Sequence, residues 1–109
     1  MGDGVLRYET DAVSIVTLSG VPNQSALEQN FPNPFHDNTA IRYSLPEDGH
    51  VRIDVYNVAG QHVAVLVDAE QGAGWHTVEF DARDHASGVY LYRLVTDDTI
   101  THKQMLLTK

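Results

Sequence analysis

Short segments of strictly alternating apolar and polar residues recur along the chain, and this pattern limits the fold most strongly. In residues 39–45, Ile41, Tyr43 and Leu45 alternate with polar side chains. A period of two is that of a β-strand, whose successive side chains point to opposite faces of a sheet. Gly, Pro, Asn and Asp separate the alternating segments, and the 3.6-residue period of an amphipathic helix is almost absent. The sequence therefore predicts an all-β protein.

Turn residues bound six predicted strands, which are residues 39–45, 50–57, 62–68, 75–81, 89–96 and 99–108. Strands of this length, with turns every eight to twelve residues, are typical of an immunoglobulin-like antiparallel β-sandwich, and we expect about seven strands in all. The last two should be antiparallel neighbours joined at Asp97-Asp98. Gly60 is predicted to take a positive φ in a turn. The apolar run 63–67 indicates a central strand covered on both faces, or one whose outer side lies under a loop.

The candidate core follows from the strand faces. Tyr90, Tyr92 and Leu94 share one face of their strand, and we expect that face to be buried. For residues 75–81 the alternation leaves open which face is the core. Trp75 follows a Gly-rich turn, and we expect it to be exposed at one end of the sandwich.

The N-terminal third differs in composition from the rest of the chain, because residues 20–38 contain three of the four prolines. We interpret this segment as a linker followed by an ordered lead-in. Its aromatic residues Phe31 and Phe35 should dock on a sheet edge or cap an open end of the core. Residues 5–8 and 13–18 are β-like and either add a strand or end a preceding domain. We therefore divide the chain into residues 1–26, linker or end of a preceding domain, and residues 27–109, the sandwich.

The charge narrows the possible partners. The 109 residues carry 15 Asp and Glu against 7 Lys and Arg, a net charge of −8. Nucleic acid and anionic membrane surfaces would be repelled. No apolar run approaches the ~20 residues of a membrane span, so we expect no membrane insertion. The chain has no Cys and begins without a signal-peptide pattern.

Patterns that indicate catalysis are absent from the sequence. The six His lack metal-motif spacing, and no nucleophile motif is present. We expect neither an enzyme nor a cofactor. Asp81 and Asp84 could bind calcium, but we favour the interpretation that they belong to a solvated loop in which Asp side chains cap the turns. Trp75 suggests a second class of function, because an exposed aromatic ring can stack on a sugar.

Six motifs in order carry a resemblance to a known family. They are LEQNFPNPF (27–35), TAIRYSLP (39–46), VYNVAGQ (55–61), GWH (74–76), ASGVYLYRL (86–94) and KQMLLTK (103–109). Together they resemble the type A C-terminal sorting domain of the type IX (Por) secretion system. They are also similar to the related immunoglobulin-like domain of flagellar hook-capping proteins.

The resemblance implies a function. It implies a module that directs a larger exported protein through the periplasm and an outer-membrane secretion translocon. A surface sorting protease then removes the module, and the cargo is attached to the cell surface or released. It also assigns recognition residues, which are Asn33, Pro34 and Phe35 of the opening motif, Gly88 and Tyr90 of the Gly-x-Tyr motif, and Lys103 and Lys109 of the terminal signal.

Alternatives stay open at this stage. Gly88 and Tyr90 could serve folding alone. The chain could instead be a carbohydrate-binding accessory module of an exported enzyme, acting through Trp75, or a structural interaction domain. The cargo, the site of removal and the oligomeric state are not specified by the sequence, and the last strand could be an edge open to pairing.

Overall fold

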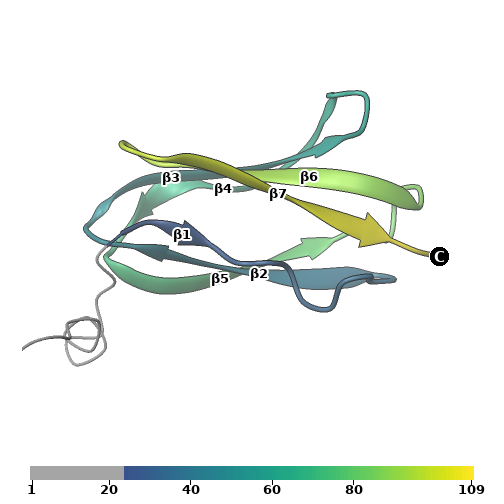
Figure 1. Ribbon diagram of the computed structural model, residues 1–109, viewed down its shortest axis with the longest axis horizontal. Coiled ribbons are helices and arrows are strands. Elements are labelled where there is room, and N and C mark those ends of the chain that lie inside the picture. The colour runs from purple at the N-terminus through teal and green to yellow at the C-terminus, as the bar shows by residue number, and fades with distance from the viewer. Residues whose placement is uncertain (1–23) are drawn as a thin grey trace, which may run out of the picture.

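The computed structural model describes residues 24–109, which form seven strands in two antiparallel sheets packed face to face (Figure 1). The prediction of an all-β sandwich of about seven strands is confirmed. The strands are β1 (Ala26–Leu27), β2 (Asn38–Leu45), β3 (Gly49–Asn57), β4 (His62–Gln71), β5 (Gly74–Asp81), β6 (Gly88–Val95) and β7 (Ile100–Leu107). The β-like segments 5–8 and 13–18 lie outside the described residues.

The smaller sheet has the order β1-β2-β5 and the larger sheet the order β4-β3-β6-β7. Every pairing between two of these strands is antiparallel. β6 and β7 are neighbours, as predicted, and Thr96 N donates to Thr99 O at 2.9 Å in the turn between them. The turn before β4 contains Gly60 with φ of 82°, the predicted positive value.

The core lies between the sheets, where the alternating side chains meet. Val51, Ile53 and Val55 of β3 are completely buried, as are Tyr92 and Leu94 of β6. This confirms the buried face predicted for β6, and the alternation in β3 places its apolar residues in the same core.

The ambiguity in β5 is also resolved. Phe80 faces the core, while Trp75 on the opposite face is 43% exposed. A strand that carries a large aromatic side chain on each face is oriented by its neighbours. Here Phe80 lies within aromatic contact of Phe35 and Tyr90.

The interpretation of residues 62–68 as a central or loop-covered strand is wrong. β4 is an edge strand of the larger sheet, and Val65 is 45% exposed. Its register with β3 shifts twice, once between Ile53 and Asp54 and once between Val55 and Tyr56. Such bulges bend an edge and oppose pairing with other chains, so an apolar run here needs no second neighbour.

Candidate functional site

The C-terminal strand β7 forms the other edge of the larger sheet and is anchored in the core. Met105 and Leu107 are 2% and 1% exposed. Lys103 is half-buried on the same side of the strand. The end of the chain that the terminal motif occupies is therefore a structural strand and not a free tail.

The opening motif clamps this strand from outside. Asn33 Oδ1 accepts a hydrogen bond from Leu106 N at 3.0 Å. Phe35 N donates to Leu106 O at 3.0 Å, and Thr108 N donates to Phe35 O at 2.8 Å. Residues 33–35 thus satisfy backbone groups that an edge strand would otherwise leave open.

Of the two aromatic residues expected to dock, Phe35 does so. Its ring is completely buried and meets Phe80 edge-on, with ring centroids 6.2 Å apart. The expectation for Phe31 is wrong, because its side chain is 79% exposed. The Phe31 backbone pairs with Ala40 in both directions at 2.9 Å, and this pairing leaves the ring directed to solvent.

A second tie joins the lead-in to the core. The Tyr92 hydroxyl accepts from Asn30 N at 2.8 Å and donates to Glu28 O at 2.7 Å. Burial raises the pKa of Tyr92 to about 12, so the hydroxyl keeps its proton at neutral pH. Asn30 Nδ2 also donates to Thr39 Oγ1 at 3.0 Å. No sequence pattern indicated this link.

The Gly-x-Tyr motif shapes the start of β6. Gly88 has φ of 150°, a conformation that side-chain-bearing residues rarely adopt. Tyr90 is 6% exposed, and its hydroxyl donates to Ala86 O at 2.6 Å. Gly88 pairs with Leu107 and Tyr90 with Met105, so the motif lies directly beside the C-terminal half of β7.

The two lysines occupy different settings. Lys103 lines a surface hollow of about 550 Å³ together with Gln29, Asn33 and Leu106. Lys109 is exposed, and its Nζ donates to Arg83 O at 2.7 Å. The structure therefore gathers Asn33, Pro34, Phe35, Gly88, Tyr90, Lys103 and Lys109 on or beside β7.

Trp75 lies apart from this group, on the outer face of the smaller sheet. The Arg42 guanidinium covers its ring at 3.9 Å from the centroid. Arg42 also pairs with Glu28 at 3.3 Å. One face of the only Trp is therefore occupied by the domain itself.

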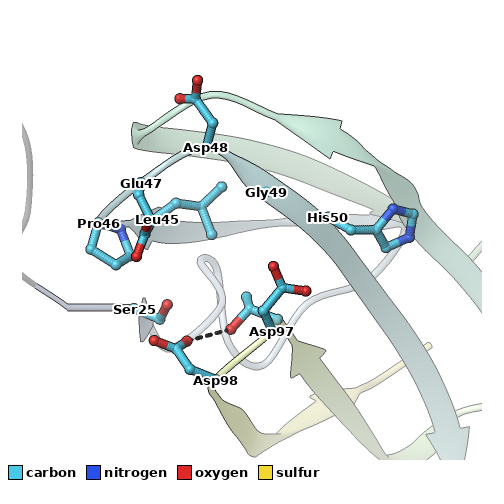
Figure 2. A pocket seen from close by; sticks show the side chains of 10 residues that line it. Ser25, Leu45, Pro46, Glu47, Asp48, Gly49, His50, Asp97 and Asp98 are labelled. Carbon is cyan, nitrogen blue, oxygen red and sulfur yellow. Dashed lines mark hydrogen bonds between the residues drawn. The ribbon is translucent and has the colours of Figure 1, made fainter.

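The acidic residues Glu47, Asp48, Asp97 and Asp98 line a hollow of about 170 Å³ together with Ser25, near the start of the described chain (Figure 2). Within residues 24–109, no three His, Asp or Glu side chains are grouped so that they could hold a metal ion. The Asp81 carboxylate, considered as a calcium ligand, binds Arg83 instead at 2.7 Å. Hydrogen bonds from Arg83 lower the pKa of Asp81 to about 2.

The comparison with protein families fits this arrangement. The family model described as "Secretion system C-terminal sorting domain" matches residues 29–108, which include the opening motif, the Gly-x-Tyr motif and nearly all of the terminal motif. The chain belongs to this family. The sorting domain is a C-terminal signal of the type IX secretion system, so it marks the protein that carries it for secretion.

A solved structure adds support for the fold of the sorting domain. The domain described here is similar to part of the crystal structure of dimeric latent PorU from Porphyromonas gingivalis, with a TM-score of 0.62 and 20% sequence identity. The match covers 77% of this chain but only 9% of the PorU chain, and it speaks for the fold alone. No curated protein matches the chain. Nowhere in residues 24–109 is there a helix of the length and apolarity that crossing a membrane requires.

Proposed function

We propose that residues 27–109 act as a non-catalytic sorting signal that takes a larger exported protein through the periplasm and across the outer membrane. In this proposal an outer-membrane translocon binds the module, and a surface sorting protease then removes it. Cleavage would fall in residues 20–25, ahead of β1, and the cargo would be attached to the surface or released. The observation that carries the proposal is the convergence of the three family motifs on β7.

The geometry supports a signal made by the folded strand and its clamp together. Asn33 and Phe35 bind the outer edge of β7, while Gly88 and Tyr90 lie on its inner neighbour. Lys103 and Lys109 add positive charge next to this strand in an acidic domain. A receptor that reads β7 would therefore meet a rigid, locally basic surface.

The experiment must distinguish a loss of export caused by a lost recognition signal from a loss of export caused by unfolding. Deleting residues 103–109 removes Met105 and Leu107, which are buried, so loss of export would follow from unfolding as readily as from loss of a signal. The double variant Lys103→Gln, Lys109→Gln removes both charges and keeps the core. Met105→Ala is the matched control, because it weakens the core and keeps both lysines.

The fusion places residues 20–109 after a signal-peptide-bearing fluorescent reporter, in a bacterium with this secretion system. The unaltered fusion should reach the surface or the medium. The double lysine variant should stay in the periplasm while its thermal unfolding midpoint is unchanged, and Met105→Ala should be exported wherever it still folds. Periplasmic retention of the unaltered fusion would contradict the sorting role.

A further inference from the structure

The outer face of the larger sheet carries an apolar strip bordered by an arginine and a histidine. Val89 of β6 lies opposite Leu106 of β7, and each is 38% exposed. Leu91 continues the strip along β6, and Arg93 lies opposite His102 at its border. We call these five residues, Val89, Leu91, Arg93, His102 and Leu106, the β6–β7 patch.

The part of this face formed by β3, β6 and β7 differs in charge from the whole domain, whereas the exposed carboxylates of Asp68 and Glu70 lie on β4 at the far edge of the sheet. Although the chain has a net charge of −8, strands β3, β6 and β7 contain a single carboxylate, that of Asp54. Asp54 is completely buried beneath Arg52, whose Nε is 2.9 Å away, and Arg93, whose Nη2 is 3.3 Å away. The exposed groups beside the apolar strip are therefore guanidinium and imidazole, not carboxylate.

The Arg93 side chain of the patch is also fixed by contacts within the domain. Arg93 Nη2 donates to the Tyr56 hydroxyl at 2.8 Å, and the guanidinium lies 5.2 Å from the Tyr56 ring centroid. Tyr56, Leu91, Arg93 and His102 line a hollow of about 290 Å³. Tyr and Arg dominate the binding energy of many protein interfaces, and fixing them in advance lowers the entropic cost of binding.

We infer that the β6–β7 patch is a docking surface for a protein of the secretion machinery that presents apolar side chains beside carboxylates. The inference rests on the proposed sorting function and names the surface that is read. Charge complementarity decides the occupant, since the patch contains the Arg93 guanidinium and no carboxylate within an acidic domain. A lipid surface fits less well, because attraction to anionic lipid uses clusters of four to eight Lys or Arg.

Three single variants in the reporter fusion test the inference. Val89→Glu places a negative charge in the strip, Val89→Lys places a positive charge at the same position, and Val65→Glu makes the first change on β4, on the outer face of the same sheet. Export should fall about tenfold or more for Val89→Glu, because like charges repel at the interface. Val89→Lys should lose no more than about threefold, because a cation suits a partner that presents carboxylates. Val65→Glu should lose no more than about twofold, because β4 lies outside the β6–β7 patch.

Each other result overturns the inference. Equal loss for Val89→Glu and Val89→Lys in folded proteins would exclude an acidic partner, and full export of both would exclude docking here. If either charged variant fails to fold, Val89→Thr replaces it, and full export of that folded variant would count against docking. Binding of the purified domain to vesicles containing phosphatidylglycerol, abolished by Val89→Glu, would assign the patch to lipid. Failure of the unaltered fusion to be exported would instead contradict the proposed function.

Discussion

Asn33 Oδ1 accepts a hydrogen bond from the backbone N–H of Leu106 at 3.0 Å, which joins the lead-in to the last strand across 73 positions of the chain. Gln29 Nε2 makes a similar contact with Gln104 O at 2.6 Å. The sequence left open whether the last strand is an edge, and β7 is an edge strand of the larger sheet. The C-terminal half of this edge is bound by the side chains of Asn33 and Gln29. The capping side chains and the family's terminal motif thus belong to one structural unit.

Replacing Asn33 by Ala should loosen the end of β7. A hydrogen bond of this kind contributes about 1 kcal/mol, so amide exchange at Leu106 should become roughly fivefold faster. Asn33→Asp keeps an acceptor oxygen and should preserve most of the protection. Hydrogen exchange followed by NMR gives the measurement. Unchanged exchange in Asn33→Ala would mean that the contact does not hold the strand.

Phe35→Ala should be strongly destabilising, because its ring is completely buried against Phe80. Removing a buried Phe costs about 3–5 kcal/mol, which chemical denaturation can measure. Phe31→Ala is the matched control in the same segment. With its ring 79% exposed, Phe31 should change the unfolding free energy by less than about 0.5 kcal/mol. Similar losses for both would contradict the assignment of Phe35 as the docking residue.

Gly88→Ala tests how far the Gly-x-Tyr motif serves folding. No atom lies within 4 Å of a Cβ built at Gly88, so the cost should come from φ of 150° alone. Backbone strain of this kind amounts to about 1–3 kcal/mol, measurable by denaturation. Gly72→Ala, where the new Cβ would meet Asp48 Oδ1 at an ordinary 3.7 Å, should cost less than about 0.5 kcal/mol. Lost export in a Gly88→Ala variant that unfolds normally would reveal a role in recognition.

Local alternation was sufficient to predict the strands and most of the core, because it reports which side of a strand is buried. Tyr92 and Leu94 were found in this way. The pattern does not report how far a strand lies from the sheet edge, which is why the apolar run in β4 was misread. Nor does it separate Phe31 from Phe35, because a Pro-rich segment has no regular period.

The contacts that complete the site could not be predicted, because they join residues far apart in the chain. Asn30 N meets the Tyr92 hydroxyl across 62 positions. Asp54 alternates with the buried Ile53 and Val55, so its side chain points to the outer face of β3. It is nevertheless buried, because Arg52 and Arg93 fold over it from two strands. Sequence alternation assigns Asp54 to the outer face of its strand. The pairing of β3 with β6 then places the Arg93 guanidinium beside the Asp54 carboxylate, and this pairing is not visible in the sequence.

Asp54 should make stability depend on pH in the acidic range. Burial raises the pKa of Asp54, but hydrogen bonds from Arg52, His62 and Arg93 outweigh it and hold the pKa below its ordinary 3.8. Because the folded pKa is the lower one, this stabilisation is present above the unfolded pKa and is lost as pH falls through the folded pKa.

Asp54→Asn should therefore lower the unfolding free energy near neutral pH by about 1–3 kcal/mol. The difference from the unaltered domain should shrink as pH falls through the lowered pKa. Denaturation at a series of pH values measures both. Asp97→Asn, at an exposed turn, should cost less than about 0.5 kcal/mol. If the difference in unfolding free energy between Asp54→Asn and the unaltered domain became larger in acid, the pKa of Asp54 would not be lowered in the folded state.

The pairing of Arg42 with Trp75 allows a test of the carbohydrate-binding alternative. Because the guanidinium covers one face of the ring at 3.9 Å, Arg42→Ala should increase quenching of the tryptophan fluorescence by acrylamide. Trp75 is the only Trp, so the signal has one source. We expect the unaltered domain and the Arg42→Ala and Trp75→Ala variants to be retained equally weakly on insoluble polysaccharide. Retention that is lost in Trp75→Ala and strengthened in Arg42→Ala would establish sugar stacking on this sheet. The sorting role of β7 would then be one of two functions, carried by opposite sheets of the same sandwich.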